Sequence, residues 1–332
     1  MTGRPAVDSI APGIELTPEH PVGEVVPLAE RAERAGFRSA LVSCHYFNRD
    51  PYVVADSVGR ATEMLVGPAA ANPYDAHPVA LASRVATLQE TTGGRAVFGL
   101  APGDRSTLAA LGVEQERPLR RVLETTRVAR RLWRGEAVDH DGTFAAADAE
   151  LRFSVDPAPV YVGAQGPHML RMAAKHADGV LVNASHPRDL AWASDRIDEG
   201  LAERPGDESG FESLAYASVS LAQDGEEARE AARPPVAFIA GGAADPVLDR
   251  HGIDRDAAER VSELVERGDL REAFAAVTPS MLDAFAVAGD PETVTQRLRE
   301  LHEHVDGVVF GAPLGPDPDE AVSLAGSVLS RL

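Results

Sequence analysis

Short apolar runs typical of buried strands alternate with helical patterns along the whole chain. Eight candidate strands lie at 12–16, 39–44, 65–71, 96–101, 159–164, 179–184, 214–221 and 307–312. They are rich in Val, Leu and Ala and show little polar alternation, as expected for strands that are covered on both faces. Eight such strands alternating with helices predict a (β/α)₈ TIM barrel, with an open doubly wound sheet as the alternative.

The predicted helices begin and end at recognisable residues. The pattern at 78–92 opens with Pro78 and closes at Gly93, and the pattern at 23–35 stops at Gly36. Proline suits the first helical turn and glycine the position after the last one. No clear boundary divides the chain, so we expect one barrel domain over 1–332. The stretch 222–306 is much longer than one helix requires and is expected to form a helical insertion between the last two strands.

Acidic residues dominate the charge. The chain has 52 Asp and Glu against 32 Lys and Arg, a net charge of −20, and Lys175 is its only lysine. A charge this negative argues against nucleic acid or an anionic membrane as the main partner. Molar salt would screen the repulsion, because the Debye length falls to about 3 Å at 1 M. We therefore expect adaptation to a salty cytoplasm; a GC-rich genome would explain the preference for Arg but not the excess of acids.

Further sequence features limit the class of protein. No secretory signal and no run of the ~20 apolar residues needed to cross a bilayer is present, so a soluble, cytoplasmic protein is expected. The single cysteine, Cys44, excludes an intramolecular disulfide and makes a cysteine-based metal site unexpected. No metal-ligand spacing occurs, and we expect no metal.

Polar residues stand at the carboxyl ends of several candidate strands, where barrel enzymes have their active sites. Each has a simple structural explanation when taken alone: Asn72 precedes Pro73 and could turn the chain, and Asp104 could cap a helix at 105–111. As a set they predict one polar cluster at one end of the barrel. They are Glu15, His45, Asn72, Asp104, Gln165 and Asn183, with Ser185 just beyond.

Glu15 is a charged residue inside an otherwise apolar stretch, PGIEL. If Gly13 and Glu15 face the barrel axis, Ile14 and Leu16 face the helices. Burial at the barrel mouth raises the pKa of a carboxyl and keeps it a proton donor near neutral pH. A structural glutamate paired with arginine is the alternative.

Two glycine-containing turns could approach a ligand closely. In YVGAQGPHML, residues 161–170, Gly163 and Gly166 join a strand to a helix whose N-terminus favours a phosphate. The second turn is LAPGDRST, residues 100–107, with Arg105. Neither matches a P-loop or a dinucleotide-binding fingerprint.

Seven segments together resemble the methylenetetrahydromethanopterin reductase family of the luciferase-like superfamily. GGRAVFGLAPGD (93–104) marks the superfamily, whereas VYVGAQGPHML (160–170), GVLVNAS (179–185) and VAFIAGGAADPVLDRHG (236–252) are more specific to the reductases. The remaining three are GIEL (13–16), GPAAANPY (67–74) and FAVAGDPETV (285–294). The resemblance implies a barrel that uses coenzyme F420, a deazaflavin, as a dissociable hydride carrier.

The resemblance also implies roles for individual residues. Glu15 would be the acid, and the strand end with a non-proline cis peptide at Ala69–Ala70 would back the deazaflavin ring. The family commonly has Asp where Cys44 precedes His45, which leaves the role of His45 open. The residues implied to bind the cofactor are His45, Ala69, Ala70, Asn72, Gly103, Asp104, Gly163, Ala164, Gln165, Gly166, Asn183, Ala184 and Ser185.

The reaction implied is reduction of 5,10-methylenetetrahydromethanopterin to the 5-methyl form by a homodimer or homotetramer. The methylene carbon bridges two nitrogens, and protonation by Glu15 would open one C–N bond before hydride adds. Methylenetetrahydrofolate is the alternative carrier. The same barrel could also serve a deazaflavin-dependent alcohol or sugar-phosphate dehydrogenase, a flavin monooxygenase, or a silent flavin-binding relative.

Overall fold

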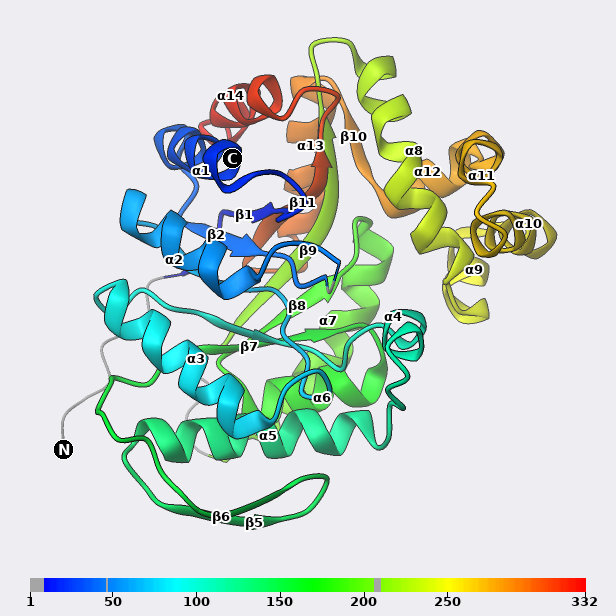
Figure 1. Cartoon of the computed structure of the whole chain (residues 1–332). Helices are drawn as coiled ribbons and strands as arrows, with labels where there is room; N and C mark the ends of the chain where they lie inside the picture. The colour runs from blue at the N-terminus through cyan, green and yellow to red at the C-terminus, as the bar shows by residue number, and fades with distance from the viewer. Residues whose placement is uncertain (1–8, 46, 206–209) are drawn as a thin grey trace.

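A ring of parallel strands forms the centre of the molecule (Figure 1). The computed structural model describes residues 9–45, 47–205 and 210–332. Its barrel strands coincide with the eight predicted runs to within a few residues, which confirms the (β/α)₈ prediction. Around the ring they are β3 (Leu65–Pro68), β2 (Ser39–Val42), β1 (Gly13–Leu16), β11 (Gly307–Leu314), β9 (Glu212–Leu221), β8 (Gly179–Asn183), β7 (Val160–Ala164) and β4 (Phe98–Leu100).

The ring closes between β3 and β4, which excludes the open-sheet alternative. Two isolated parallel bridges, Val66 to Ala96 and Ala71 to Leu100, join these strands. The backbones approach closely because both strands carry glycine where they meet. A Cβ atom on Gly67 would lie 1.9 Å from the Val97 carbonyl oxygen, and a Cβ on Gly99 would lie 2.3 Å from that of Pro68. Any side chain at either position would force the strands apart.

Eight helices form an outer layer in which each packs against the next. Most begin with proline in the first turn, where the missing N–H is not needed, and several are capped by an Asp side chain, as α2 is by Asp50. The helices predicted at 23–35 and 78–92 are confirmed. In order around the barrel they are α1 (Val22–Ala35), α2 (Pro51–Ala61), α3 (Pro78–Thr91), α5 (Pro118–Trp133), α6 (Pro167–His176), α7 (Pro187–Leu201), α13 (Pro291–His302) and α14 (Pro318–Leu329).

Side chains from the strands build two apolar layers. Ile14 and Leu16 pack outward against the helices, as the alternation along β1 predicted. A second cluster, which includes Leu41, Leu181 and Val309, fills the inside of the barrel. The barrel interior is therefore a packed core, and a cavity lies above it at the carboxyl ends of the strands.

Most of the stretch 222–306 leaves the barrel as a lobe, at the right of Figure 1, whereas α13 at its end belongs to the outer layer of the barrel. The apolar side chains of the lobe form a separate cluster that includes Val236, Val261 and Met281. The stretch is not entirely helical, because the short strand β10 (Val287–Gly289) pairs with the outer end of β9. The lobe helices are α8 (Gly225–Gly241), α9 (Asp245–His251), α10 (Arg255–Glu266), α11 (Leu270–Ala276) and α12 (Pro279–Phe285).

A buried carboxylate fastens this lobe to the barrel. Asp189, in the first turn of α7, accepts a hydrogen bond from Arg250 of α9, and the His251 Nε2 atom lies 2.7 Å from its second oxygen. Burial opposes ionisation, but the hydrogen bonds from His251 and Arg250 outweigh it and lower the pKa of Asp189. Arg250 and His251 belong to the segment 236–252, so this reductase-like stretch holds the lobe against the helix that follows β8.

An antiparallel hairpin lies outside the barrel between α5 and β7 and was not predicted. Its strands are β5 (Val138–Asp141) and β6 (Ala145–Ala149). The second strand reads AAADA, which lacks the β-branched and aromatic residues that mark strands in a sequence. The six-residue helix α4 (Arg105–Ala110) was expected as a capped helix. Within the described residues, no helix combines the length and apolar character needed to span a bilayer.

Candidate functional site

A cavity of about 690 Å³ opens at the carboxyl ends of the strands. Its walls come from the segments that follow β2, β3, β4, β7 and β8. Most of the residues expected to bind the cofactor line it: His45, Ala69, Ala70, Asn72, Gly103, Asp104, Gly163, Ala164, Gln165, Gly166 and Asn183. The tertiary structure thus brings together residues from five separate parts of the sequence.

Small side chains line one wall of this cavity. The peptide between Ala69 and Ala70 is cis, which confirms the prediction for this bond. On the neighbouring strand ends, a Cβ atom on Gly163 would lie 3.1 Å from the Ala101 Cβ and 4.0 Å from the Ala70 Cβ. Since the lining has no bulky side chain here, a planar ring system could lie against it with wide apolar contact.

One end of the cavity meets the N-terminus of α6. Gly166 is the N-cap residue, Pro167 is the first helical residue, and no side chain caps this terminus. The cavity lining continues along it through Gln165, Gly166 and His168. A helix N-terminus carries a partial positive charge and favours an anionic group such as a phosphate.

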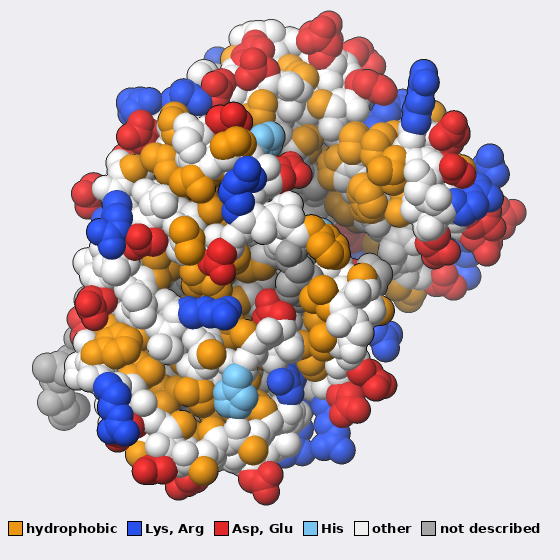
Figure 2. Space-filling view, viewed as in Figure 1, with side chains coloured by type: hydrophobic (Ala, Val, Ile, Leu, Met, Phe, Trp, Pro, Cys, Tyr) orange, Lys and Arg blue, Asp and Glu red, His pale blue; other side chains and the backbone are white. Residues whose placement is uncertain are grey.

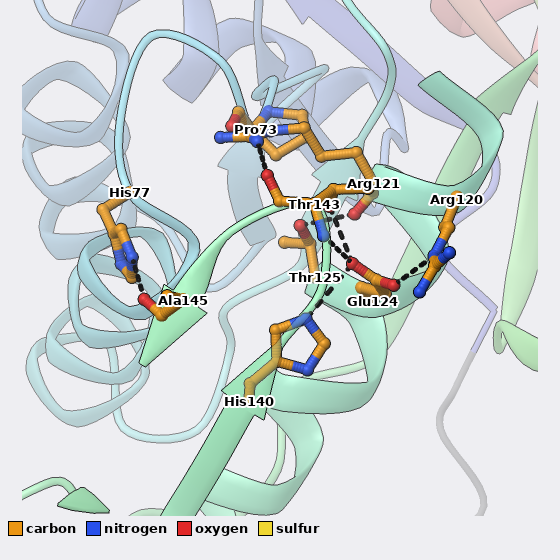
Figure 3. Close-up of polar contacts among 9 residues, drawn as sticks. All are labelled: Pro73, His77, Arg120, Arg121, Glu124, Thr125, His140, Thr143 and Ala145. Atoms are coloured by element: carbon orange, nitrogen blue, oxygen red, sulfur yellow. Dashed lines mark hydrogen bonds and ion pairs between the residues drawn. The ribbon is translucent and has the colours of Figure 1, made fainter. Parts of the chain in front are cut away.

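Hydrogen bonds to backbone groups hold the loop around Asn72, which forms part of the cavity wall. The Asn72 side-chain oxygen accepts from the N–H groups of Tyr74 and Asp75, at 3.0 and 3.1 Å, so it turns the chain as the sequence suggested. Arg121 reaches from α5 and donates to the carbonyl oxygens of Pro73 and Thr143 (Figure 3). The same guanidinium lies 4.7 Å from the centre of the Tyr74 ring. These contacts tie the loop after β3 to α5 and to the hairpin.

Glu124 anchors the hairpin to α5 (Figure 3). Its Oε2 accepts from the Thr143 backbone N–H and hydroxyl, both at 2.7 Å, and its Oε1 accepts from Arg120 at 2.6 Å. His140 lies 3.1 Å from Oε2. Burial works against ionisation, but these partners outweigh it and lower the pKa of Glu124 to about 2. The network is structural: it supports the cavity wall through Thr143 and Arg121.

Glu15 lies at the end of β1 and points toward the barrel axis, as its alternation with Ile14 predicted. Its Oε2 accepts from the Ala312 backbone N–H at 2.9 Å, where β11 departs from regular pairing with β9. The hydroxyl groups of Tyr216 and Ser43 lie near the carboxyl and oppose the rise in its pKa, and no arginine pairs with it among the described residues. Burial raises the pKa of Glu15 despite these groups. The residue therefore has the character of a partly buried acid rather than of a surface ion pair.

Three expected site residues stand apart from the cavity lining: Glu15, Ala184 and Ser185. The Ser185 hydroxyl is buried and accepts from the Ser218 backbone N–H at 3.0 Å, so it ties β9 to the segment after β8. Asp104 lines the rim and caps α4, where its carboxylate accepts from the Thr107 backbone N–H at 2.8 Å. Within the described ranges, no group of three or more His, Cys, Asp or Glu could hold a metal ion.

Comparison with known proteins places this site in a family. Residues 6–306 match the model of the luciferase-like monooxygenase family. The chain is 40% identical to the 5,10-methylenetetrahydromethanopterin reductase of Archaeoglobus fulgidus, over 95% of this chain and 97% of that protein. The chain belongs to the luciferase-like family, and within it to the methylenetetrahydromethanopterin reductases. It is accordingly an oxidoreductase of that type.

Two further reductases of this family support the assignment. The enzyme from Methanolobus tindarius is 37% identical, over 95% of this chain and 98% of that protein. The structure of the coenzyme F420-dependent tetrahydromethanopterin reductase from Methanopyrus kandleri superposes with a TM-score of 0.89 at 37% identity. It covers 95% of this chain and 96% of that one. The similarity therefore extends over the barrel and the lobe alike.

Sequence reasoning overlooked two residues that shape the site. Tyr216 lines the cavity and comes from the middle of β9, where it reads as one more core residue of the run LAYASVSL. Gln115 donates from its side-chain amide to the carbonyl oxygens of Pro102 and Gly103, both at 2.8 Å, and so fixes the turn after β4. The only local indication that Tyr216 belongs to the site was the presence of a tyrosine among the small residues of this strand.

Proposed function

We propose that this protein catalyses the coenzyme F420-dependent reduction of 5,10-methylenetetrahydromethanopterin to 5-methyltetrahydromethanopterin. The observation that carries the proposal is a partly buried carboxyl with a raised pKa at the end of β1, near a cavity lined largely by small residues. The relatives named above, which share nearly the whole length of the chain, carry this activity in their names.

The cavity suits a deazaflavin. The small residues around Ala70 and Gly163 would lie against the planar ring, and the uncapped N-terminus of α6 at Gly166 would receive the phosphate of the side chain. When bound, the reduced deazaflavin supplies the hydride. The cavity opens at the barrel mouth, which is consistent with a carrier that binds and leaves in each cycle.

Glu15 supplies the proton that the reaction needs. Protonation of one nitrogen of the substrate's five-membered ring breaks the C–N bond to the methylene carbon, and hydride then adds to that carbon. Burial keeps Glu15 protonated to a higher pH than an exposed glutamate, because it disfavours the carboxylate. The Ala312 N–H stabilises the carboxylate that remains after proton transfer.

The test is turnover of reduced F420 with methylenetetrahydromethanopterin in concentrated KCl, followed by the loss of reduced cofactor. Methylenetetrahydrofolate is assayed in parallel, because the two carriers share the methylene ring on which the reaction takes place. Turnover with methylenetetrahydromethanopterin and loss of turnover in Glu15→Gln support the proposal. Inactivity with that pterin, or efficient F420-dependent oxidation of a secondary alcohol or a sugar phosphate instead, would reject it.

A further inference from the structure

A second, smaller pocket adjoins the main cavity where β2 and β3 end. Its volume is about 260 Å³, and its walls come from the loop after β2, the start of α2, the loop after β3 and α3. Cys44 and His45 line both spaces and mark the boundary between them. We call the smaller space, which Tyr52, Asp75 and Arg84 also line, the side pocket.

The side pocket lies on the flank of the cavity from which Glu15 comes. β1, which carries Glu15, pairs with β2. The loops that follow these two strands are joined, because the Arg49 Nη1 atom donates to the carbonyl oxygen of Glu19 at 2.8 Å. A ligand held in the side pocket would therefore extend past Cys44 and His45 toward Glu15 and the main cavity.

The charged groups of the side pocket differ in how far the protein itself uses them. Arg49 donates to backbone carbonyl oxygens, and Asp50 caps α2 by accepting from the Tyr52 N–H at 2.9 Å. The Arg84 guanidinium forms no hydrogen bond or ion pair among the described residues, and it lies 5.5 Å from the centre of the Tyr52 ring. Its hydrogen-bond donors are thus available to a ligand.

Asp75 supplies an acceptor beside these donors. The Asn72 side-chain oxygen accepts from the Asp75 N–H at 3.1 Å and so fixes the backbone of this residue. Burial raises the pKa of Asp75, and the charge of Arg84 opposes that rise, so the two groups are close enough to interact. The side pocket therefore presents a carboxyl and a guanidinium next to each other on one wall.

A polar ring with donors and an acceptor along one edge suits this pair. The pyrimidine ring of a pterin carries an amino group, a ring N–H and a carbonyl oxygen side by side. A carboxylate can accept from the first two, and a guanidinium can donate to the third. Pockets that enclose a whole drug-sized ligand measure about 300–1,000 Å³. The side pocket is smaller, so it suits one ring at the end of a larger molecule.

We propose that the side pocket binds the pyrimidine edge of the pterin carrier and that Asp75 and Arg84 recognise it, an inference that rests on the proposed function. The methylene-bearing ring then lies over Cys44 and His45, between Glu15 and the small-residue wall of the main cavity. Asp75 and Arg84 hold the part of the substrate that does not react, so they contribute to binding and not to the chemical step.

Arg84→Gln and Asp75→Asn each remove one charged partner of the ring. We expect the KM for methylenetetrahydromethanopterin to rise at least about tenfold in each variant, as for the loss of a hydrogen bond to a charged group. At saturating pterin, kcat should stay within about threefold, because uniform binding is lost. The affinity for F420, measured by its fluorescence without pterin, should also change less than about threefold, since the ring wall of the main cavity is untouched.

The second carrier distinguishes the ring from the chain attached to it. Methylenetetrahydrofolate has the same pyrimidine edge and a different acidic chain. Each variant should therefore weaken both carriers by the same factor, measured as KM where the carrier is turned over and as Ki where it only competes. Arg34→Gln is the matched control, because Arg34 is exposed in the last turn of α1 and lines neither space. It removes the same charge and should leave the affinity for both carriers unchanged.

A wild-type KM in folded Arg84→Gln and Asp75→Asn would overturn the assignment and leave the proposed function intact. Unequal losses for the two carriers would also overturn it, because they would place these residues against the chain. An equal loss in Arg34→Gln would overturn it as a long-range charge effect. If Arg84→Gln unfolds, Arg84→Lys replaces it, and a raised KM is the supporting result, since lysine keeps the charge but lacks the paired donors.

The wild-type assay separates failure of this inference from failure of the proposed function. If the wild-type protein does not reduce methylenetetrahydromethanopterin with F420, the proposed function fails, and the pterin assignment of the side pocket fails with it. If the wild-type protein is active and the variants keep its KM, only the assignment of the side pocket fails.

Discussion

The chemistry of Glu15 is set by the few atoms around its carboxyl. An exposed glutamate is almost fully ionised at neutral pH, whereas burial at the end of β1 raises the pKa of this one. The Ala312 N–H, Tyr216 and Ser43 limit the shift, and the hydrogen bond from Ala312 orients the group. A general acid needs both properties, a proton at working pH and a fixed direction in which to give it.

Replacing Glu15 by Gln preserves shape and removes the transferable proton. We expect the fold and F420 affinity to persist while kcat falls by about 10²–10⁴-fold. Cofactor affinity, melting temperature and kcat measured on one preparation test this. Near-wild-type kcat would exclude Glu15 as the acid, and a lower melting temperature with activity retained per folded molecule would identify a structural glutamate.

The raised pKa of Glu15 also predicts a pH dependence of stability. The folded protein holds this proton to a higher pH than the unfolded chain does. Stability is therefore lost as pH rises from the ordinary carboxyl value of 4.5 through the raised folded pKa of Glu15. Glu15→Gln does not titrate, so its melting temperature should lack this decline. Melting temperatures of the wild type and of Glu15→Gln are compared between acidic and neutral pH. Identical pH profiles would show that Glu15 does not have a raised pKa in the folded protein.

Among the elements, the junction of β3 and β4 decides whether the barrel closes. Gly67→Ala would place a methyl group 1.9 Å from the Val97 carbonyl oxygen, which belongs to backbone and cannot rotate away. We expect the free energy of unfolding to fall by about 3 kcal/mol or more. Gly23→Ala is the control, since nothing lies within 4 Å of that position in α1, and it should stabilise the protein by about 0.5–1 kcal/mol. Denaturant unfolding with equal losses in both variants would contradict this account.

The contact between α7 and α9 decides how the lobe sits on the barrel. Asp189→Asn leaves Arg250 and His251 without the buried carboxylate that they share. We expect a loss of about 1–3 kcal/mol, with faster hydrogen exchange concentrated in α9–α12. Asp195→Asn is the control on the same helix, because its carboxylate, paired with Arg196, is exposed and surface pairs contribute about 0–1 kcal/mol. If hydrogen exchange instead became faster to the same extent across the whole barrel, the contact would not act locally on the lobe.

At the scale of the whole molecule, charge and exposed apolar surface set the conditions for assembly. Acidic and basic side chains share the face seen in Figure 2, and hydrophobic side chains gather over α8 and α12, where Phe238 is 52% exposed. An excess of 20 negative charges repels both within a chain and between copies. A homodimer or homotetramer, as we propose, would bury apolar surface only where salt screens that repulsion.

This balance predicts assemblies that are stable in concentrated salt and weaken in dilute buffer. Melting temperature and mass should both rise between about 0.1 and 3 M KCl, a range over which the Debye length falls from ~10 Å to below 3 Å. Light scattering after size-exclusion chromatography and thermal melts at each concentration provide the measurement. Values that do not change with salt would contradict adaptation to a salty cytoplasm.

The sequence by itself determined the fold class, because strand and helix periodicities are local. Apolar runs such as 159–164 and helix ends such as Gly36 depend on a few neighbouring residues, so they can be predicted from the sequence alone. The directions of the side chains along β1 could also be inferred, because Glu15 alternates with Ile14 and Leu16. The hairpin β5–β6 and the strand β10 were missed because their residues carry weak strand preference and pair only in the folded context.

Only the tertiary structure decided the partners of each site residue. Glu15 lies near Tyr216 and Ala312, which are hundreds of residues away along the chain, and no local sequence pattern indicates that these residues are neighbours. Ser185 was expected to be a site residue, as Glu15 was, yet its hydroxyl accepts a hydrogen bond from the Ser218 backbone N–H inside the protein. Side-chain direction and depth depend on how the whole barrel closes, which is a property of all its strands together.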